Sequence, residues 1–290
     1  MSWAEIRERY AELVKDRDAA APMAASWIAF KETVEATRDQ PPYHLCTLLS
    51  TLRRVERNRA AEEIVVLDHG CGGGLTLLYL LARGYRGIYG VDVGKNSLAW
   101  NRLLQEVHGI AEERFRTYDG RDLPLPDRSV DVIFSQQVLE HVGADRIESY
   151  YAEEGRVLKP GGLVLHQVPH RLVPYDSHSR TWFIHYLPWS LQRPLYKLLG
   201  RDVERIESYI HLRWPSYHCR QVEKHIGGYT DITLDRLVEL EVGDYYDGPL
   251  AVRRMITAIV SAPLVGRLAG AILRHFVMLE TLAVRSSPED

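Results

Sequence analysis

The chain has 290 residues, of which 46% are hydrophobic, and a formal net charge of −3 at pH 7. This length provides a sizeable buried core and exceeds the usual size of one domain, so a core with appended elements is expected. The weak negative charge, with no basic run, argues against nucleic acid as a partner, and three scattered cysteines (Cys46, Cys71 and Cys219) argue against a disulfide framework or a zinc site.

The first 60 residues predict helices. Trp3 to Val14 is amphipathic, the prolines at 41 and 42 interrupt the pattern, and Leu45 to Val55 resumes it. The segment from Met1 to Glu5 has no signal-peptide pattern, so a cytoplasmic location is the expectation.

A strand, a glycine turn and a helix follow in direct succession. The apolar run from Val65 ends at Asp68, glycines then occupy positions 70, 72 and 74, and Leu75 to Ala82 predicts a helix. Glycines at such a turn let a nucleotide-like ligand approach bare backbone at a helix N-terminus. The spacing D-x-G-x-G-x-G differs from the G-x-G-x-x-G fingerprint of dinucleotide-binding proteins.

Three further blocks continue the alternation of strands and helices. Gly87 to Asp92 predicts a second strand ending in an acid, which suits the two hydroxyls of a ribose; helix capping is the alternative role for Asp92. Phe115 to Gly120 predicts a third strand with its turn, and Asp122 to Ser135 an L-P block with a fourth strand.

A turn at Leu158 to Gly162 leads into a fifth strand at Leu163 to Leu165. Alternating strands and helices over residues 64–170 predict an α/β fold with a parallel sheet and helices on both faces.

These blocks, from Ile64 to about Val168, resemble the class I S-adenosylmethionine-dependent methyltransferases. The resemblance implies a Rossmann-like, doubly wound and mostly parallel seven-stranded sheet, with S-adenosylmethionine as methyl donor. In the roles that it implies, the loop holds the methionine part, Asp92 the ribose and Asp119 the adenine edge, and the end of the fourth strand borders donor and acceptor. The implied cofactor-binding residues are Asp68, Gly70, Cys71, Gly72, Gly74, Asp92, Val93, Asp119, Gly120, Ser135 and Gln136.

The resemblance also suggests a domain organisation. Residues 1–60 would form a helical lid or docking arm, with plain packing against the sheet as the alternative, and residues 61–170 the cofactor-binding core. Residues 171–250 would form an acceptor-pocket insertion and the return to the sheet. Within it, residues 171–220 read as irregular and are rich in aromatic residues: Tyr175, Trp182, Phe183, Tyr186, Trp189, Tyr196, Tyr209, Trp214 and Tyr217.

Residues 251–290 would hold amphipathic helices and a final strand at Phe276 to Val284, inserted antiparallel. Pro263 and several arginines interrupt the apolar stretch from Met255 to Leu273, so no transmembrane span is expected. Contact of these helices with a lipid surface or with a second subunit, as in a homodimer, is compatible with their pattern.

Histidines supply candidate bases for deprotonating an acceptor hydroxyl. His178 and His185 flank Trp182 and Phe183 in the insertion and are the leading candidates, with His141 third. Packing or capping is the alternative role for each, as for the neighbouring histidines at 166 and 170. A histidine at position 69 departs from the family pattern, and it would contact a ligand or a neighbouring loop.

The segment from Gln137 to His141 resembles the E-x-x-E-H pattern that holds a divalent ion in some members of the family. Gln137 stands where an acid is expected, which removes a charge that hard cations prefer. No metal is therefore expected.

The function implied is methyl transfer to a small-molecule or saccharide acceptor, at a hydroxyl. Methylation of an amine stays open, whereas Ser135 to Val138 replaces the Asn-Pro-Pro-Tyr motif of amide and nucleobase N-methyltransferases. An NAD-dependent oxidoreductase is disfavoured by the glycine spacing, and a catalytically silent cofactor-binding subunit by the intact loop.

Overall fold

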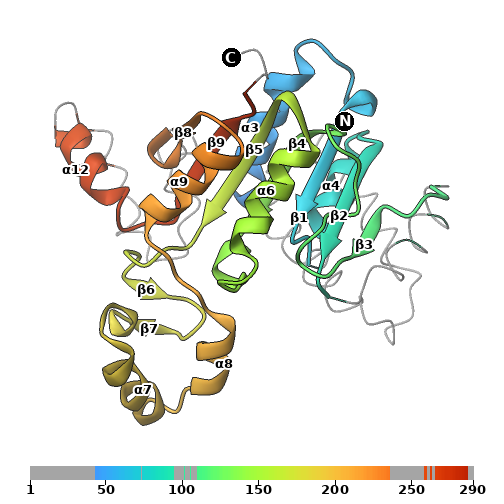
Figure 1. Ribbon diagram of the computed structural model, residues 1–290. Coiled ribbons are helices and arrows are strands. Elements are labelled where there is room, and N and C mark those ends of the chain that lie inside the picture. The colour runs from blue at the N-terminus through green and yellow to red at the C-terminus, as the bar shows by residue number, and fades with distance from the viewer. Residues whose placement is uncertain are drawn as a thin grey trace. The chain divides into compact units, whose positions relative to one another are not determined.

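A computed structural model describes residues 43–72, 74–94, 101, 105, 110–235, 258–259, 262 and 265–286 (Figure 1). Contacts divide the chain into two units. The first unit comprises residues 1–135, 153–165 and 285–290, and the second comprises residues 136–152 and 166–284. The chain passes from the first unit to the second at Ser135 and Gln136, near the end of strand β4.

The first unit contains the strand, turn and helix that the glycine motif predicted, together with the neighbouring strands. Its elements are α3 (Tyr43–Glu56), η1 (Ala61–Glu63), β1 (Val65–His69), α4 (Leu75–Ala82), β2 (Gly87–Asp92), β3 (Phe115–Thr117), most of β4 (Val130–Gln136), and the adjoining parts of α6 (Ile147–Val157) and β5 (Leu158–Val168). The predicted helix at Leu75 to Ala82 and the predicted strand at Gly87 to Asp92 are confirmed with the same bounds.

The second unit holds the insertion and the end of the sheet. Its elements are η2 (Leu139–His141), the hairpin β6 (Tyr175–Asp176) and β7 (Thr181–Trp182), η3 (Ile184–Tyr186), α7 (Trp189–Leu198), α8 (Val203–Tyr209), α9 (Pro215–His225), β8 (Tyr229–Asp231), α12 (Val265–Leu273) and β9 (Leu279–Val284). Helices thus occupy about half of residues 171–220, the stretch that reads as irregular in the sequence. Short amphipathic helices such as α8, which Asp202 caps by accepting a hydrogen bond from the Arg205 backbone, leave a weak periodic signal.

Seven strands form one sheet in the order β3-β2-β1-β4-β5-β9-β8. Strand β1 pairs parallel with β2 and β4, and β2 pairs parallel with β3, whereas β8 and β9 are antiparallel. The predicted Rossmann-like, mostly parallel sheet is confirmed, including a final strand placed between two others. Parallel pairing brings the carboxyl ends of β1, β2 and β4 to one edge, where ligands bind in such folds.

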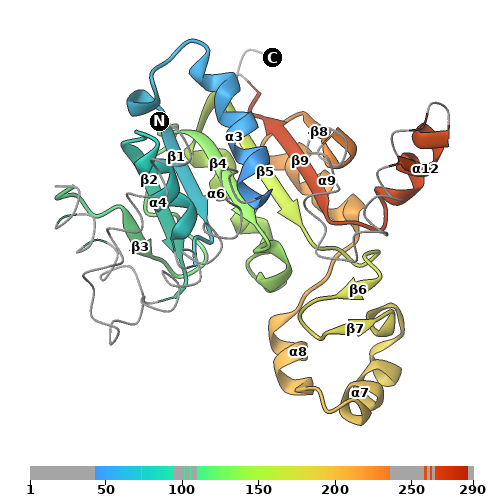
Figure 2. The same ribbon diagram turned by 180° about the vertical axis from the view of Figure 1, so that it is seen from behind.

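Helix α3 belongs to the core of the first unit. Leu45, Leu48 and Leu52 repeat at helical spacing and are fully buried. Figure 2 shows α3 and α4 in front of the strands of this unit. The predicted helix at Leu45 to Val55 is confirmed, but the one at Trp3 to Val14 lies outside the described residues, so a lid or arm at residues 1–60 stays a prediction.

Strand β5 begins at Leu158, five residues before the predicted start. The Leu158–Gly162 segment is part of the strand because Arg285 supplies backbone partners: Gly161 donates to the Arg285 carbonyl and Arg285 donates to that of Gly162, each at 3.0 Å. Toward the C-terminus, β9 starts three residues later than predicted. Of the predicted helices between Met255 and Leu273, the structure describes α12, and most of the rest lies outside the described residues.

Candidate functional site

The glycine turn after β1 is shaped for close approach of a ligand. The backbone N–H groups of Gly70 and Cys71 both donate to the Val91 carbonyl, at 2.8 and 3.0 Å, which ties the turn to β2. Gly72 has a φ of +49°, and a Cβ added there would meet no atom within 4 Å. Gly74, at φ +65°, caps the N-terminus of α4. The turn therefore offers bare backbone and open space beside a helix N-terminus.

Two carboxylates flank this turn. Burial raises the pKa of Asp68 to about 7, and the negative charge of Asp92 adds to the rise. Asp92 accepts hydrogen bonds from the backbone of Gly72 at 2.9 Å and of Gly94 at 2.8 Å, one on each carboxylate oxygen. Each oxygen keeps lone pairs for a further donor. Asp68 is costly to ionise unless a positive charge lies nearby, and Asp92 can accept hydrogen bonds from hydroxyl groups. The pair therefore fits a ligand that has a positive charge and hydroxyl donors, as S-adenosylmethionine does.

The remaining implied cofactor residues follow other strand ends. Asp119 is exposed and accepts hydrogen bonds from the backbone of Arg121 and Asp122; these bonds lower its pKa. Gly120 and Ser135 are buried, Cys71 is half-buried with its thiol pKa raised by burial, and Val93 is exposed. Gln136 belongs to the second unit, where its amide donates to the Gln167 side chain at 2.7 Å. Their roles toward the cofactor stay predictions.

His69 is fully buried. Its Nδ1 lies 2.9 Å from a Glu154 carboxylate oxygen and its Nε2 lies 2.8 Å from the Tyr118 hydroxyl. The imidazole thus bridges helix α6 and the segment after β3 within the first unit. Of the two roles considered for it, contact with a neighbouring loop is the one observed.

In the second unit, three ionisable side chains converge. The Glu140 side chain is fully buried, and neither carboxylate oxygen has a hydrogen-bond partner among the described residues. The Nε2 atoms of His141 and His178 both lie 3.8 Å from the same oxygen of Glu140. One ligand atom from each of the three side chains lies within 4.8 Å of the others. We call Glu140, His141 and His178 the Glu–His cluster.

Hydrogen bonds at Nδ1 orient both imidazoles of the cluster. Nδ1 of His178 lies 3.3 Å from Asp176, and Nδ1 of His141 lies 3.0 Å from the Tyr209 carbonyl, with the Tyr209 ring stacked on His141 at 4.2 Å between centroids. Both Nε2 atoms are therefore the free ends of oriented imidazoles.

Backbone contacts fix η2, which carries Glu140 and His141. Gln137 adopts a φ of +53° at the end of β4, and its N–H donates to the Gln167 carbonyl at 2.9 Å. Arg213 donates to the carbonyls of Leu139 at 2.7 Å and Val142 at 2.5 Å, and the His211 N–H donates to that of Glu140 at 2.6 Å. A non-glycine residue in the left-handed region is strained, and such strain concentrates at functional sites.

The electrostatics of the cluster favour a proton acceptor. Burial raises the pKa of Glu140 to about 7. The hydrogen bond to Asp176 raises the pKa of His178 against the opposing effect of burial, whereas burial lowers that of His141. Burial also opposes ionisation of Asp176, but hydrogen bonds from His178 and Ser179 outweigh it and lower its pKa to about 2. Asp176 is therefore a fixed negative charge behind His178.

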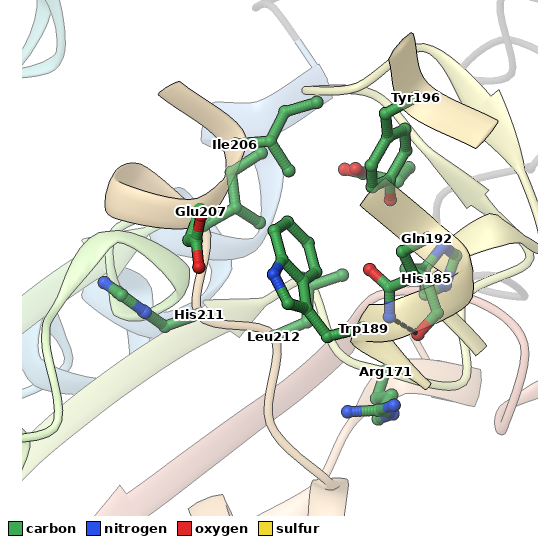
Figure 3. A pocket seen from close by; sticks show the side chains of 11 residues that line it. Arg171, His185, Trp189, Gln192, Tyr196, Ile206, Glu207, His211 and Leu212 are labelled. Atoms are coloured by element: carbon green, nitrogen blue, oxygen red, sulfur yellow. Dashed lines mark hydrogen bonds between the residues drawn. The ribbon is translucent and has the colours of Figure 1, made fainter. Parts of the chain in front are cut away.

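A cavity of about 370 Å³ opens in the same unit (Figure 3). Figure 3 shows the indole of Trp189 reaching into it between Glu207 and His211 on one side and Gln192 and His185 on the other. Its lining combines apolar and polar side chains: Arg171, Asp176, His185, Trp189, Gln192, Tyr196, Ile206, Glu207, Ile210, His211 and Leu212. Asp176 thus contributes both to the cavity wall and to the support of His178.

The structure separates the candidate histidines. His141 and His178 meet, with ring centroids 4.7 Å apart, whereas His185 lines the cavity outside the Glu–His cluster. His170 is buried, and its Nε2 lies 2.8 Å from the Val277 carbonyl, which indicates a packing role. His166 is fully buried beside Tyr151, at 5.8 Å between ring centroids.

A proton-transfer role for Glu140 and a supporting role for Asp176 are not evident from the sequence. The spacing of Asp176 and His178, two residues apart, is a signal that could have suggested an oriented histidine. For Glu140 the sequence suggests only a metal-ligand role, because nothing in it shows that the carboxylate is buried without a hydrogen-bond partner among the described residues.

A doubly wound sheet with a glycine turn and paired acids at its strand ends defines a Rossmann-like domain that binds S-adenosylmethionine. Residues 67–166 match the family described as a methyltransferase domain. This part of the chain is a methyltransferase domain of the class I S-adenosylmethionine-dependent type.

Similar proteins were found by sequence and by structure. Sphingolipid C9-methyltransferase of Candida albicans is 29% identical over 142 residues, which cover 47% of this chain and 26% of that protein. Ubiquinone biosynthesis O-methyltransferase of Paramagnetospirillum magneticum is 32% identical over 108 residues, or 37% of this chain and 41% of that protein. The structure of geranyl diphosphate C-methyltransferase from Streptomyces coelicolor is 14% identical, covers 97% of each chain and has a TM-score of 0.47.

The chain spans less than half the length of these two curated relatives. Within the part of the chain that the structure describes, no helix has the length and apolar character needed to cross a bilayer.

Proposed function

We propose that this chain transfers the methyl group of S-adenosylmethionine to a hydroxyl of a small-molecule or saccharide acceptor. The observation that carries the proposal is the Glu–His cluster: a buried, unpartnered carboxylate with two oriented imidazoles 3.8 Å from one of its oxygens. Such a group accepts the proton that a hydroxyl must lose on methylation. A relative named for O-methylation in ubiquinone biosynthesis supports a hydroxyl acceptor.

The cofactor supplies a sulfonium-activated methyl group when bound. Asp68 and the turn at Gly72 would hold its charged methionine part, and Asp92 its ribose. Because the methyl group is already activated, the protein mainly has to align the acceptor oxygen, exclude water and receive one proton.

His178 is the proposed base. Its Nδ1–H donates to Asp176, which fixes the tautomer with a lone pair on Nε2. Nε2 of His178 would accept the hydroxyl proton as the acceptor oxygen takes the methyl group that the bound cofactor would supply. The negative charges of Asp176 and Glu140 stabilise the imidazolium until it releases the proton to solvent. His141 is the alternative base, and His185 is proposed to contact the acceptor in the cavity.

The cavity is the proposed acceptor pocket. Trp189 and Tyr196 provide apolar surface, whereas Arg171, Glu207 and His185 provide donors and acceptors that can orient hydroxyl groups. Mass spectrometry of acceptor panels that include polyols, phenols and amines, incubated with the chain and cofactor, tests the proposal. Gain of one methylene at a hydroxyl supports it; transfer confined to amines, or reduction of a nicotinamide cofactor, overturns it.

A divalent-ion site is a second candidate role for the Glu–His cluster. The support is that both imidazoles are tied at Nδ1, so that both Nε2 atoms and a carboxylate oxygen lie within 4.8 Å of one another. Metal independence, expected from Gln137, stays a prediction. Exhaustive treatment with EDTA should leave turnover unchanged. Loss of turnover that Mg²⁺ or Mn²⁺ restores would assign the three side chains as ligands.

A further inference from the structure

Four aromatic side chains stand exposed on the hairpin of the second unit. Tyr175 is 39% exposed, Trp182 61%, Phe183 53% and Tyr186 37%. Their rings form a continuous series, with centroid distances of 5.1 Å for Tyr175–Trp182, 5.9 Å for Trp182–Phe183 and 5.7 Å for Phe183–Tyr186. We call the segment Tyr175–Tyr186 the aromatic hairpin. None of these four residues lines the proposed acceptor pocket.

Backbone hydrogen bonds fix the aromatic hairpin, and one of its residues has a strained backbone conformation. Tyr175 pairs with Trp182 across β6 and β7, the Phe183 N–H donates to the Pro174 carbonyl at 2.8 Å, and the Tyr186 N–H donates to that of Phe183 at 3.0 Å. Phe183 has φ +60° and ψ −9°, a left-handed conformation that is unfavourable for a bulky side chain. A phenyl group that is more than half exposed is thus kept in a strained position, and such strain is often found at binding sites.

The segment that contains the hairpin and α7 is cationic, in contrast to the protein as a whole. Residues 171–201 contain Arg171, Arg180, Arg193, Lys197 and Arg201 but only one acid, so their net charge is +4, against −3 for the chain. That acid, Asp176, is buried and accepts hydrogen bonds from the backbone of residues 178 and 179.

Exposed leucines accompany these cations. On and after α7, Leu191 is 52% exposed, Leu198 81% and Leu199 51%. Among the described residues, Arg180, Arg193 and Lys197 form no ion pair. Apolar and positively charged groups are therefore both available for an external partner.

We propose that the aromatic hairpin and α7 form a docking surface for an anionic lipid bilayer. Trp and Tyr rings favour the headgroup region, Phe and Leu enter the acyl boundary, and cations gain from anionic headgroups. A symmetric contact with a second copy is disfavoured, because it would bring two surfaces of the same charge together. The proposal is independent of the acceptor's identity and of the methyl-transfer proposal.

The test is flotation of the full chain with vesicles of phosphatidylcholine alone and of phosphatidylcholine mixed with phosphatidylglycerol. We expect binding to the mixed vesicles, weakened by added salt. Phe183→Asn is the sharpest variant, because asparagine tolerates the left-handed backbone while the apolar ring is lost. We expect it, and Trp182→Gln, to reduce partitioning by about tenfold or more. Arg193→Gln combined with Lys197→Gln should reduce it by roughly 10- to 30-fold.

Trp214→Gln is the matched control, because Trp214 is 54% exposed in the same unit but lies outside the hairpin; it should bind as the unmodified chain does. Leu268→Gln tests α12, where Leu268 is 69% exposed. Calorimetric titration with S-adenosylmethionine shows whether each variant keeps a folded first unit. Failure of the unmodified chain to bind mixed vesicles would overturn the proposal. The proposal would also be overturned if Phe183→Asn and Trp182→Gln bound vesicles as well as the unmodified chain, or if only Leu268→Gln lost binding. It would be overturned too if the unmodified chain formed a dimer that those two hairpin variants dissociate.

Discussion

Replacing Glu140 with glutamine should raise stability and lower activity together. The pKa of Glu140 is raised from 4.5 to about 7 by burial, and its carboxylate has no hydrogen-bond partner among the described residues. Because the unfolded chain ionises more readily, the contribution of this group to the free energy of unfolding is fully present below pH 4.5. It is lost as the pH rises to about 7.

The loss amounts to about 3 kcal/mol above pH 7, since each pKa unit corresponds to about 1.4 kcal/mol. Glutamine has nearly the same shape and no charge. We therefore expect Glu140→Gln to melt roughly 5–10 °C higher than the unmodified chain at pH 8. The two proteins should converge near pH 4.5. At the same time kcat should fall by about 10²-fold or more, because the imidazolium loses a stabilising charge.

Thermal melts by circular dichroism at the two pH values, with turnover assays, measure both effects. Glu154→Gln is the matched control: Glu154 is also buried, but its carboxylate lies 2.9 Å from His69. Removing a partnered carboxylate should destabilise the protein at pH 8. If Glu140→Gln also melts lower at pH 8, its carboxylate has a cationic partner in the folded protein and the argument fails.

Further expectations concern the cofactor and the base. Asp92→Ala should weaken S-adenosylmethionine binding at least about tenfold, because a charge-assisted hydrogen bond is worth roughly 1.5–3 kcal/mol; unchanged affinity by calorimetry would refute the ribose assignment. His178→Ala should lower kcat by roughly 10²–10⁴-fold with cofactor affinity intact, whereas His185→Ala should mainly raise the KM for the acceptor; the reverse pattern would move the base to His185. Because the pKa of His178 is raised, the acidic limb of the kcat profile should lie above pH 6.5. Asp176→Asn should shift that limb to lower pH, and an unshifted limb would contradict the orienting role of Asp176.

The features that the sequence predicted well are local. The run ending at Asp68, the glycine turn and α4 lie within 18 consecutive residues, and each depends on the conformational preferences of its own residues. The start of β5 was misplaced because its backbone partner, Arg285, is far along the chain.

In the candidate site, too, the residue types are evident from the sequence, whereas their contacts depend on distant parts of the chain. His141 and His178 were each named from the sequence, but their meeting depends on the fold that joins η2 to the hairpin. The burial of Glu140 depends on it too: Arg213 and His211 hold the η2 backbone from a segment more than 60 residues away in the chain. No periodicity or spacing reports such a contact.

Strained backbone conformations are unevenly distributed between the two units. In the part of the chain that the structure describes, four residues other than glycine have a positive φ, and three of them, Gln137, Arg180 and Phe183, lie in the second unit. Gln137 directly precedes η2, and Phe183 carries an exposed ring on the aromatic hairpin. In the first unit, by contrast, the turn after β1 obtains its positive φ values from glycines, without the steric strain that a side chain adds. Strain that packing does not require persists where binding or chemistry requires it. By that criterion, strain is concentrated in the unit that holds both the proposed proton-accepting cluster and the proposed docking surface.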